Sequence, residues 1–172
     1  DGQYAAMAIN NRDAIVGFYQ ETNDVSSPHE AFILDDGELT LLGTLNNHSD
    51  SYAYDLNDSN QVVGISSNGD NTPSQSFIWS KDAGFVTVDV EALYTSGLTG
   101  INNSGMAIGT GPTFVNNQFL AKHAIIYANG TISDLGPTDT SPSGLIQQSD
   151  ATAVNDAGTV VGYNGPSLSQ QA

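Results

Sequence analysis

Apolar and polar residues alternate along this chain in short runs, and tight polar turns separate the runs. One arrangement recurs four times: an aliphatic residue, an asparagine, a polar turn, and a second aliphatic run that ends in glycine. From one copy to the next, the closing glycines are 47, 45 and 53 residues apart. A period in this range is typical of proteins built from structural repeats. The copies span residues 9–17, 56–64, 101–109 and 154–162.

Each copy predicts a strand, a tight turn and a second strand. The asparagine that leads the turn can bond its own backbone two residues further on, which favours a turn. The fourth turn position holds aspartate, asparagine or glycine, the residue types that accept a left-handed φ at least cost. A type I turn followed by such a residue joins antiparallel strands. The turn positions expected to hold the hairpins are Asn10, Asp13, Asn57, Asn60, Asn102, Gly105, Asn155 and Gly158.

Two further apolar runs follow each of the first three hairpins. In the first unit they are residues 29–34 and 38–42, on either side of a turn. Four strands in a unit of 47 residues have the spacing of an antiparallel meander. Asn129 and Gly130 predict a type I′ hairpin in the third unit, whereas residues 111–117 and 137–150 are expected to form loops. No stretch shows a sustained apolar stripe with a period of 3.6 residues, so helices should be scarce.

The predicted fold class is all-β: a β-propeller-like array of four-stranded antiparallel meander repeats, with three complete repeats and one half. The whole chain, 1–172, is interpreted as a single repeat domain. The repeats are expected at approximately 4–50, 51–94, 95–150 and, for the half-repeat, 151–164, with a tail at 165–172.

Small residues predict close packing in the hairpins. Ala6 and Ala8 fall on one face of the first strand by a period of two, and most corresponding positions in the other units are also small. Gly17 and its counterparts indicate a close approach of backbone. A ligand crevice would explain these glycines, but tight packing between units is the preferred interpretation because every unit has one.

The chain is strongly acidic, with 19 acidic residues against three basic ones and a net charge of −16. Such a surface repels nucleic acid and anionic membranes. No apolar run approaches the roughly 18 residues of a membrane span, and no basic-then-apolar leader opens the chain, so we expect a mature soluble segment. The absence of cysteine excludes disulfides and thiolate metal sites.

The acidity is interpreted mainly as a source of solubility. The alternative is weak Ca²⁺ binding by oxygen-rich turns at residues 35–38 or 68–71. Neither turn has the ligand spacing of a twelve-residue calcium loop. We therefore expect no specific metal site and no cofactor.

Residues 151–162, together with His123-Ala124-Ile125 and Asp134-Leu135-Gly136, resemble the HAF-type extracellular repeat family. That family is named for a His-Ala-Phe triplet that follows an A-x-A-I-N-x-x-G-x-V-V-G segment and precedes a D-L-G-T-L ending. The resemblance covers nearly the whole chain, with departures: the first unit reads His29-Glu30-Ala31-Phe32, and the second has Ser76-Phe77 without histidine. It implies a secreted or surface protein of a bacterium or archaeon with a propeller-like fold. The family has no established catalytic residues, so none are transferred.

No catalytic residue is expected from the chemistry of the side chains either. His29, His48 and His123 fall in different units without metal-ligand spacing, and no G-x-S-x-G nucleophile motif occurs. Carboxylates are concentrated in turns, where solvation explains them better than a paired acid and base. A glycosidase site assembled from several units stays open as an alternative.

The incomplete last repeat suggests association. Unpaired strand edges are templates for pairing, and adjacent copies could complete one another by strand addition or by end-to-end packing. Head-to-tail packing that does not close on itself produces filaments. We therefore expect a secreted, non-enzymatic structural protein that assembles head-to-tail into an extracellular filament or surface layer. Its partner would be further copies of the same chain.

The alternative function is a glycan- or cell-surface-binding propeller module. Trp79 or Phe114 would then be an exposed platform on which a sugar stacks. Leu34 and Tyr127 occupy the position of Trp79 in the other units, so packing between units is the preferred interpretation of this tryptophan.

Overall fold

The computed structural model describes residues 2–22, 24, 27–69, 74–88, 97–115, 118–136 and 147–166. These residues form fourteen β-strands in four antiparallel sheets and include no helix. The prediction of an all-β chain of meander repeats is confirmed, and the propeller-like arrangement of the repeats stays a prediction. Within the described part of the chain, no helix could therefore cross a membrane.

Each of the first three sheets is a meander of consecutive strands, and we call the four sheets with their turns units 1 to 4. Unit 1 contains β1 (Gln3–Ile9), β2 (Ile15–Gln20), β3 (His29–Asp35) and β4 (Glu38–Gly43). Unit 2 contains β5 (Asp50–Leu56), β6 (Val62–Ser67), β7 (Gln75–Ser80) and β8 (Gly84–Val88). Unit 3 contains β9 (Gly97–Ile101), β10 (Ala107–Val115), β11 (Gln118–Ala128) and β12 (Thr131–Asp134). Unit 4 contains β13 (Gln147–Val154) and β14 (Val160–Pro166), with no third strand among the described residues.

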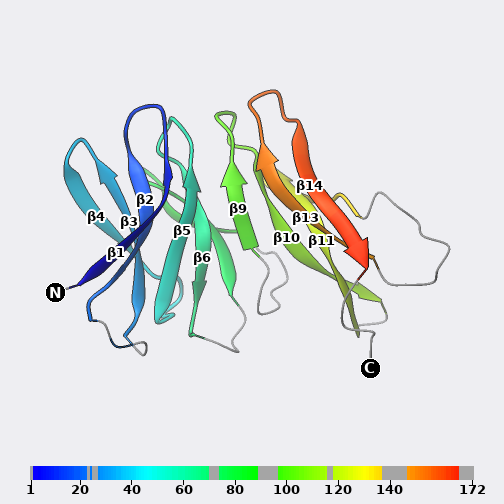
Figure 1. The fold of residues 1–172 in the computed structure, drawn as a ribbon, viewed down its shortest axis with the longest axis horizontal. Coiled ribbons are helices and arrows are strands. Elements are labelled where there is room, and N and C mark those ends of the chain that lie inside the picture. Colours follow the sequence, from blue (N-terminus) through cyan, green and yellow to red (C-terminus); the bar gives the residue numbers. More distant parts are fainter. Residues whose placement is uncertain are drawn as a thin grey trace.

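The units follow one another in chain order along the long axis of the molecule (Figure 1). The first strand of each later unit packs on the preceding sheet: β5 on β2 and β3, β9 on β6, and β13 on β10 and β11. The apolar core is accordingly divided into three clusters, one at each junction between neighbouring units. Units 1 and 4 lie at opposite ends of the row (Figure 1).

A β-bulge interrupts the first strand of every unit. In unit 1, Ala6 pairs with Gly17 and Ala8 pairs with Val16, which leaves Met7 as the extra residue. The hairpins of the other three units have the same shift in register. Because the bulge adds one residue to one strand, Ala6 and Ala8 lie on opposite faces of the sheet. The prediction that they share a face is therefore wrong.

The bulge also explains the glycine opposite it. A Cβ atom added to Gly17 would lie 1.9 Å from the carbonyl oxygen of Ala5, and one added to Gly64 would lie 2.0 Å from that of Tyr52. The predicted close approach of backbone is confirmed. Its cause is the neighbouring strand of the same hairpin, and not, as expected, the packing of one unit on the next.

Two segments expected to be loops belong to strands. Residues 111–115 continue β10 and pair with β11. Pro112 is tolerated there because β9 begins at Gly97, opposite Thr110, so beyond that pair the described part of β10 has only one neighbouring strand. Residues 147–150 begin β13, because the Ser149 hydroxyl accepts a hydrogen bond from the N–H of Ala124 at 2.9 Å and so binds this segment to unit 3.

Candidate functional site

The four hairpin turns use their leading asparagines as predicted. Asn10 Oδ1 accepts hydrogen bonds from the N–H groups of Arg12 and Ala14, each at 3.0 Å. Asn57 and Asn102 bond their own turns in the same way, and Asn155 Oδ1 accepts the N–H of Thr159. The predicted left-handed positions are confirmed, with φ of 62° at Asp13, 55° at Asn60, 81° at Gly105 and 80° at Gly158.

The same asparagines also join neighbouring units. Asn10 Nδ2 donates to the carbonyl oxygen of Asn57 at 2.9 Å, and Asn57 Nδ2 donates to that of Asn102 at 3.1 Å. Asn102 Nδ2 donates to the carbonyl oxygen of Asn155 at 2.9 Å. We call these four residues the Asn ladder. Its two inner members are buried, with Asn57 3% and Asn102 4% exposed.

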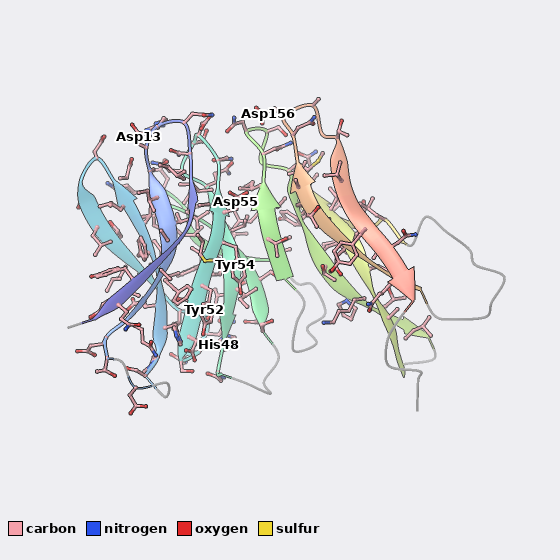
Figure 2. All side chains as sticks on the ribbon, in the orientation of Figure 1. Asp13, His48, Tyr52, Tyr54, Asp55 and Asp156 are labelled. Atoms are coloured by element: carbon pink, nitrogen blue, oxygen red, sulfur yellow. The ribbon has the colours of Figure 1, made fainter. Side chains whose placement is uncertain are left out.

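A second row of hydrogen bonds lies one residue further along each turn. Its members are Asn11, Asp58, Asn103 and Asp156, and we call it the alternating row because amide and carboxylate side chains alternate. The backbone N–H of each member donates to the side chain of the next, at distances between 2.8 and 3.0 Å. The turns that carry both rows lie along one edge of the molecule, where Figure 2 labels Asp13 in unit 1 and Asp156 in unit 4.

The amide groups of the alternating row stabilise the charged form of the neighbouring carboxylates by donating hydrogen bonds to them. Asn11 Nδ2 and Asn103 Nδ2 both donate to Asp58 Oδ2, at 3.0 and 2.9 Å. Asn103 Nδ2 also donates to Asp156 Oδ2 at 3.1 Å. The side-chain and backbone hydrogen bonds from Asn11 lower the pKa of Asp58, and they outweigh its partial desolvation. No two carboxylates of the row are neighbours.

Asp55, at the junction of units 2 and 3, differs from Asp58 because its pKa is raised and not lowered. Burial raises the pKa of this carboxyl, although the N–H groups of Ile101 and Leu56 oppose the rise by donating to it. The counterparts of Asp55 in the other units are alanine or glycine. Asp55 therefore adds one hydrogen bond to Ile101 at 2.8 Å that the other junctions lack at this position.

At every internal junction the same two apolar positions pack into the core, although Val154 is only partly buried. The earlier unit supplies the aliphatic residue before its hairpin glycine, and these residues are fully buried: Val16, Val63 and Ile108. The later unit supplies the aliphatic residue before its leading asparagine: Leu56, Ile101 and Val154. The residue before the leading asparagine pairs with the neighbour of the residue before the glycine, as Leu56 pairs with Val62, so these two positions lie on opposite faces of each unit. Each unit thus has two different faces that fit one another.

At the two ends of the row, the same positions are exposed. Val161 in unit 4 corresponds to Val16 but is 57% exposed, beside Tyr163 at 61%. Ile9 in unit 1 corresponds to Leu56, which is 5% exposed, but is itself 62% exposed. We call the surface around Val161 and Tyr163 the unit 4 end face, and the surface around Ile9 the unit 1 end face. The rings of Tyr4 and Tyr19 cover part of the unit 1 end face near Phe32.

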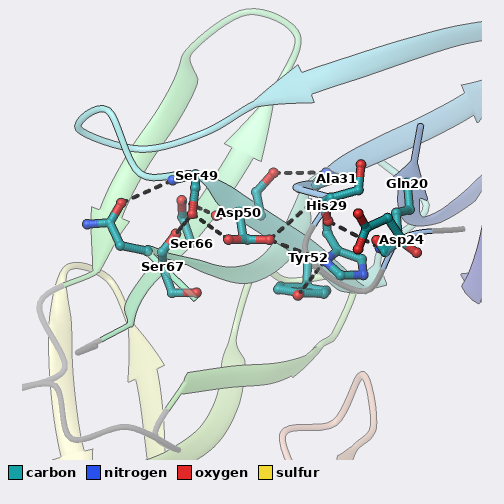
Figure 3. A network of polar contacts seen from close by, with 12 residues as sticks. Gln20, Asp24, His29, Ala31, Ser49, Asp50, Tyr52, Ser66 and Ser67 are labelled. Carbon is teal, nitrogen blue, oxygen red and sulfur yellow. Dashed lines mark hydrogen bonds and ion pairs between the residues drawn. The ribbon is translucent and has the colours of Figure 1, made fainter. Parts of the chain in front are cut away.

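A polar network around Asp50 joins units 1 and 2 at another place (Figure 3). Asp50 Oδ1 accepts the backbone N–H of His29 at 3.0 Å and lies 3.2 Å from His29 Nδ1, while Ser49 Oγ donates to Oδ2 at 2.5 Å. Burial alone would raise the pKa of Asp50, but the hydrogen bonds from Ser49 and His29 outweigh it and lower this pKa. Since Ser49 donates to the carboxylate and not to the imidazole, the arrangement differs from a Ser-His-Asp relay. It fixes the start of β5 against β3.

The remaining candidate residues lie apart from one another. Trp79 is partly buried against the core between units 1 and 2, which confirms the interpretation of this tryptophan as a packing residue. His48 Nδ1 lies 3.2 Å from Ser66 Oγ, whereas His123 Nδ1 lies 2.9 Å from Asp134 Oδ2 in unit 3. The side chain of Phe114 lies outside the described residues.

The acidic turns considered for Ca²⁺ are residues 35–38 and 68–71. No group of three histidine, aspartate or glutamate side chains in the described part of the chain could hold a metal ion. In the first turn, Asp35 Oδ2 accepts a hydrogen bond from Asn60 Nδ2 at 2.7 Å, which links units 1 and 2. In the second turn, residues 70 and 71 lie outside the described residues.

The sequence predicts the leading asparagines of the turns but not the hydrogen bonds between units. A signal for the alternating row is present, because the residue after each leading asparagine is asparagine, aspartate, asparagine and aspartate in turn. No protein-family model matches the chain, and comparisons with curated proteins and with solved structures gave no match. The relation to the HAF-type repeat family stays a prediction.

Proposed function

We propose that this chain is a secreted, non-enzymatic structural protein whose copies join head-to-tail in an extracellular filament or surface layer. In this assembly, the unit 1 end face of one copy packs on the unit 4 end face of the next. The observation that carries the proposal is the exposure of Ile9 and Val161. Residues at these two positions pack into the core at each internal junction, and all but the partly buried Val154 are buried there, so a second copy would cover Ile9 and Val161 in the same way.

The hydrogen-bonded rows support the same direction of joining. The alternating row begins with Asn11 and ends with Asp156, so a second copy would place an amide next to the last carboxylate. The N–H of Asp156 would then donate to Asn11 Oδ1 of that copy. Asn155 Nδ2 would donate to the carbonyl oxygen of Asn10, which continues the Asn ladder. Neither row would change its pattern at the joint.

The position of the two end faces favours contact between molecules over contact within one. They lie at opposite ends of the row of units (Figure 1). A contact between two different faces is heterologous, and it produces a filament unless the rotation from copy to copy closes a ring. The size of a propeller-like rotation between units would determine whether a filament or a ring results. The acidic, cysteine-free composition and the resemblance to extracellular repeats support a secreted location.

The test is to place a charge on the unit 4 end face. We expect the unaltered chain to form assemblies whose mass rises with concentration in sedimentation experiments and which appear as filaments or layers by electron microscopy. Val161→Asp should remain monomeric, because it would bury a carboxylate in an apolar joint. Val86→Asp is the matched control, since Val86 is 45% exposed on β8, away from both end faces, and this variant should assemble normally.

Mixing two blocked variants tests the head-to-tail direction. Ile9→Asp blocks the unit 1 end face, and Val161→Asp blocks the unit 4 end face. Each variant alone should be monomeric, but an equimolar mixture should form dimers, because one intact face of each kind remains. Circular dichroism should show that both variants stay folded. A chain that remains monomeric at millimolar concentration, or a Val161→Asp variant that still assembles, would overturn the proposal.

A further inference from the structure

Four asparagines of the chain begin the triplet Asn-x-Ser/Thr, the acceptor sequence of N-linked glycosylation. They are Asn47, Asn57, Asn102 and Asn129. The glycosyltransferase must reach the side-chain amide of the asparagine, and it also binds the hydroxyl group of the third residue. A triplet is therefore open to modification in the folded chain only if its amide is exposed and its hydroxyl group is free.

The two triplets in the hairpin turns have buried amides. Asn57 is 3% exposed and Asn102 is 4% exposed, and the Nδ2 atom of each donates to the neighbouring unit within the Asn ladder. The hydroxyl group of Ser104 is also engaged, because it donates to Asn102 Oδ1 at 2.7 Å. A glycan on either buried amide would force two units apart, so the fold excludes both sites.

The triplet at residues 47–49 has an exposed asparagine, but its hydroxyl group is engaged. Ser49 Oγ donates to Asp50 Oδ2 at 2.5 Å, within the network that joins units 1 and 2. The N–H of Ser49 donates to Asn68 Oδ1 at 3.1 Å, which fixes the backbone as well. The transferase would have to break both hydrogen bonds before it could bind this triplet.

Asn129 lies at the tip of the turn between β11 and β12. The φ angles of Asn129 and Gly130 are 52° and 79°, both positive as the predicted type I′ turn requires. All three residues of the triplet are exposed, and no atom beyond the adjacent residues lies within 4 Å of a Cβ built on Gly130. The side chains of Asn129 and Thr131 make no hydrogen bond within the described residues. Of the four triplets, only this one combines an exposed amide with a free hydroxyl group.

We propose that Asn129 is the N-glycosylation site of the folded chain and that the other three triplets stay unmodified. The donor is a lipid-linked oligosaccharide. Asn129 Nδ2 forms a bond to the anomeric carbon of the sugar, the bond from that carbon to the lipid pyrophosphate breaks with its electron pair, and the nitrogen loses one proton to a base of the transferase. The product carries a bulky, hydrated group on unit 3.

The site is separate from both end faces. It belongs to unit 3, whereas the end faces surround Ile9 in unit 1 and Val161 in unit 4. A glycan on Asn129 would therefore leave the joint between copies open. The proposal rests on the proposed secreted location, because these transferases act on exported chains, but it does not depend on head-to-tail assembly.

The test combines the purified folded chain with a lipid-linked oligosaccharide and a purified oligosaccharyltransferase that requires only the Asn-x-Ser/Thr triplet. Mass spectrometry of the intact chain counts the glycans, and peptide mapping locates them. We expect one glycan, on Asn129. Four synthetic peptides, each with one triplet and its flanking residues, are the control, and all should be modified because no fold hides their amides.

Variants test the two requirements separately. Thr131→Ala should lose the glycan, whereas Thr131→Ser should keep it. The turn between β3 and β4 is a matched acceptor, because Asp36 and Gly37 have φ angles of 49° and 79° and are exposed. Asp36→Asn combined with Glu38→Thr writes the triplet into this turn, and a second glycan should then appear.

Three results would overturn the proposal: a folded chain without a glycan on Asn129, a folded chain modified at any of the other three triplets, or a double variant that gains no second glycan. Circular dichroism verifies that each chain is folded. Sedimentation of the same samples separates this proposal from the proposed function. A chain that assembles without a glycan contradicts only the glycosylation site, and a glycosylated chain that stays monomeric contradicts only the joint.

Discussion

Asn57 shows how one side chain serves both its own turn and the neighbouring unit. Its Oδ1 accepts the N–H groups of Ser59 and Gln61, each at 3.0 Å, and its Nδ2 donates to the carbonyl oxygen of Asn102. Only an amide offers an acceptor and two donors on such a short side chain. An aspartate could form the turn but could not donate to the next unit. The Asn ladder therefore requires asparagine at this position, not merely a turn-forming residue.

Asn57→Ala and Asn155→Ala test this double role. Asn57→Ala leaves buried N–H and C=O groups without partners, so the free energy of unfolding should fall by about 1–3 kcal/mol. Asn155 is exposed and ends the ladder within one copy, so Asn155→Ala should cost less than Asn57→Ala. Urea denaturation of both variants measures the difference. Equal losses would contradict a ladder that stabilises internal junctions.

The lowered pKa of Asp58 predicts a dependence of stability on acid. A carboxyl whose pKa is lower in the folded state stabilises the fold above the ordinary aspartate range of about 4, and this contribution is lost as the pH falls through the folded-state value. The urea midpoint should therefore decrease in this acidic range. Asp58→Asn should have a lower urea midpoint at neutral pH, and its midpoint should decrease less than that of the unaltered chain as the pH falls. Asp82→Asn, in the exposed β7–β8 turn, is the control and should follow the unaltered chain.

At this scale, the sequence predicted what each residue does to its own backbone. Asp13 and Asn60 were placed at left-handed positions because the steric preference of a residue acts locally. The hydrogen bonds of Asn11 and Asp58 were not predicted, because they depend on how two units 47 residues apart are placed in space. The alternation of amide and acid was visible, but it has no physical meaning until the turns lie side by side.

At the scale of elements, the bulged hairpin determines which faces can meet. It places Ala53 on the same face of unit 2 as Leu56, so that both residues join the core shared with unit 1. In a hairpin without the bulge, every residue before this point of the first strand would point to the other face of the sheet. The glycine opposite the bulge is therefore a requirement of the junctions, even though it contacts its own hairpin.

Gly64→Ala should disturb this arrangement. The added methyl group would collide with the carbonyl oxygen of Tyr52 and with the ring of Phe77, so we expect a loss of about 1–3 kcal/mol in the free energy of unfolding. Gly165→Ala is the control, because no atom lies within 4 Å of its added Cβ, and its effect should stay within about 0.5 kcal/mol. Thermal or urea denaturation measures both. A stable Gly64→Ala variant would show that the bulge can shift without cost.

Period-two alternation located most strands, but not their full extents. Residues 111–115 and 147–150 are rich in polar residues, glycine or proline, and local propensity alone predicts loops there. Their strands are stabilised by a neighbouring strand or sheet, as the bond from Ala124 to Ser149 shows. The pocket between units 3 and 4, which Leu135 and Ser149 line, could not be predicted either, because its walls meet only once the two units are stacked.

At the scale of the whole molecule, charge should control how readily copies join. Each copy carries a net charge of −16, so approaching copies repel one another over the Debye length. This length is about 10 Å in 0.1 M salt and about 3 Å in 1 M salt. Added sodium chloride should therefore accelerate assembly and lower the concentration at which it begins, as light scattering would show. Slower assembly in high salt would indicate joints held by ion pairs instead of apolar contact.

The alternating row places a parity condition on the number of units. With four units, the row ends on Asp156 when it begins on Asn11, so an identical chain can follow without two acids becoming adjacent. A chain that gained or lost a single unit would bring either two carboxylates or two amides together at some step. Natural or engineered length variants that still polymerise should therefore differ by even numbers of units.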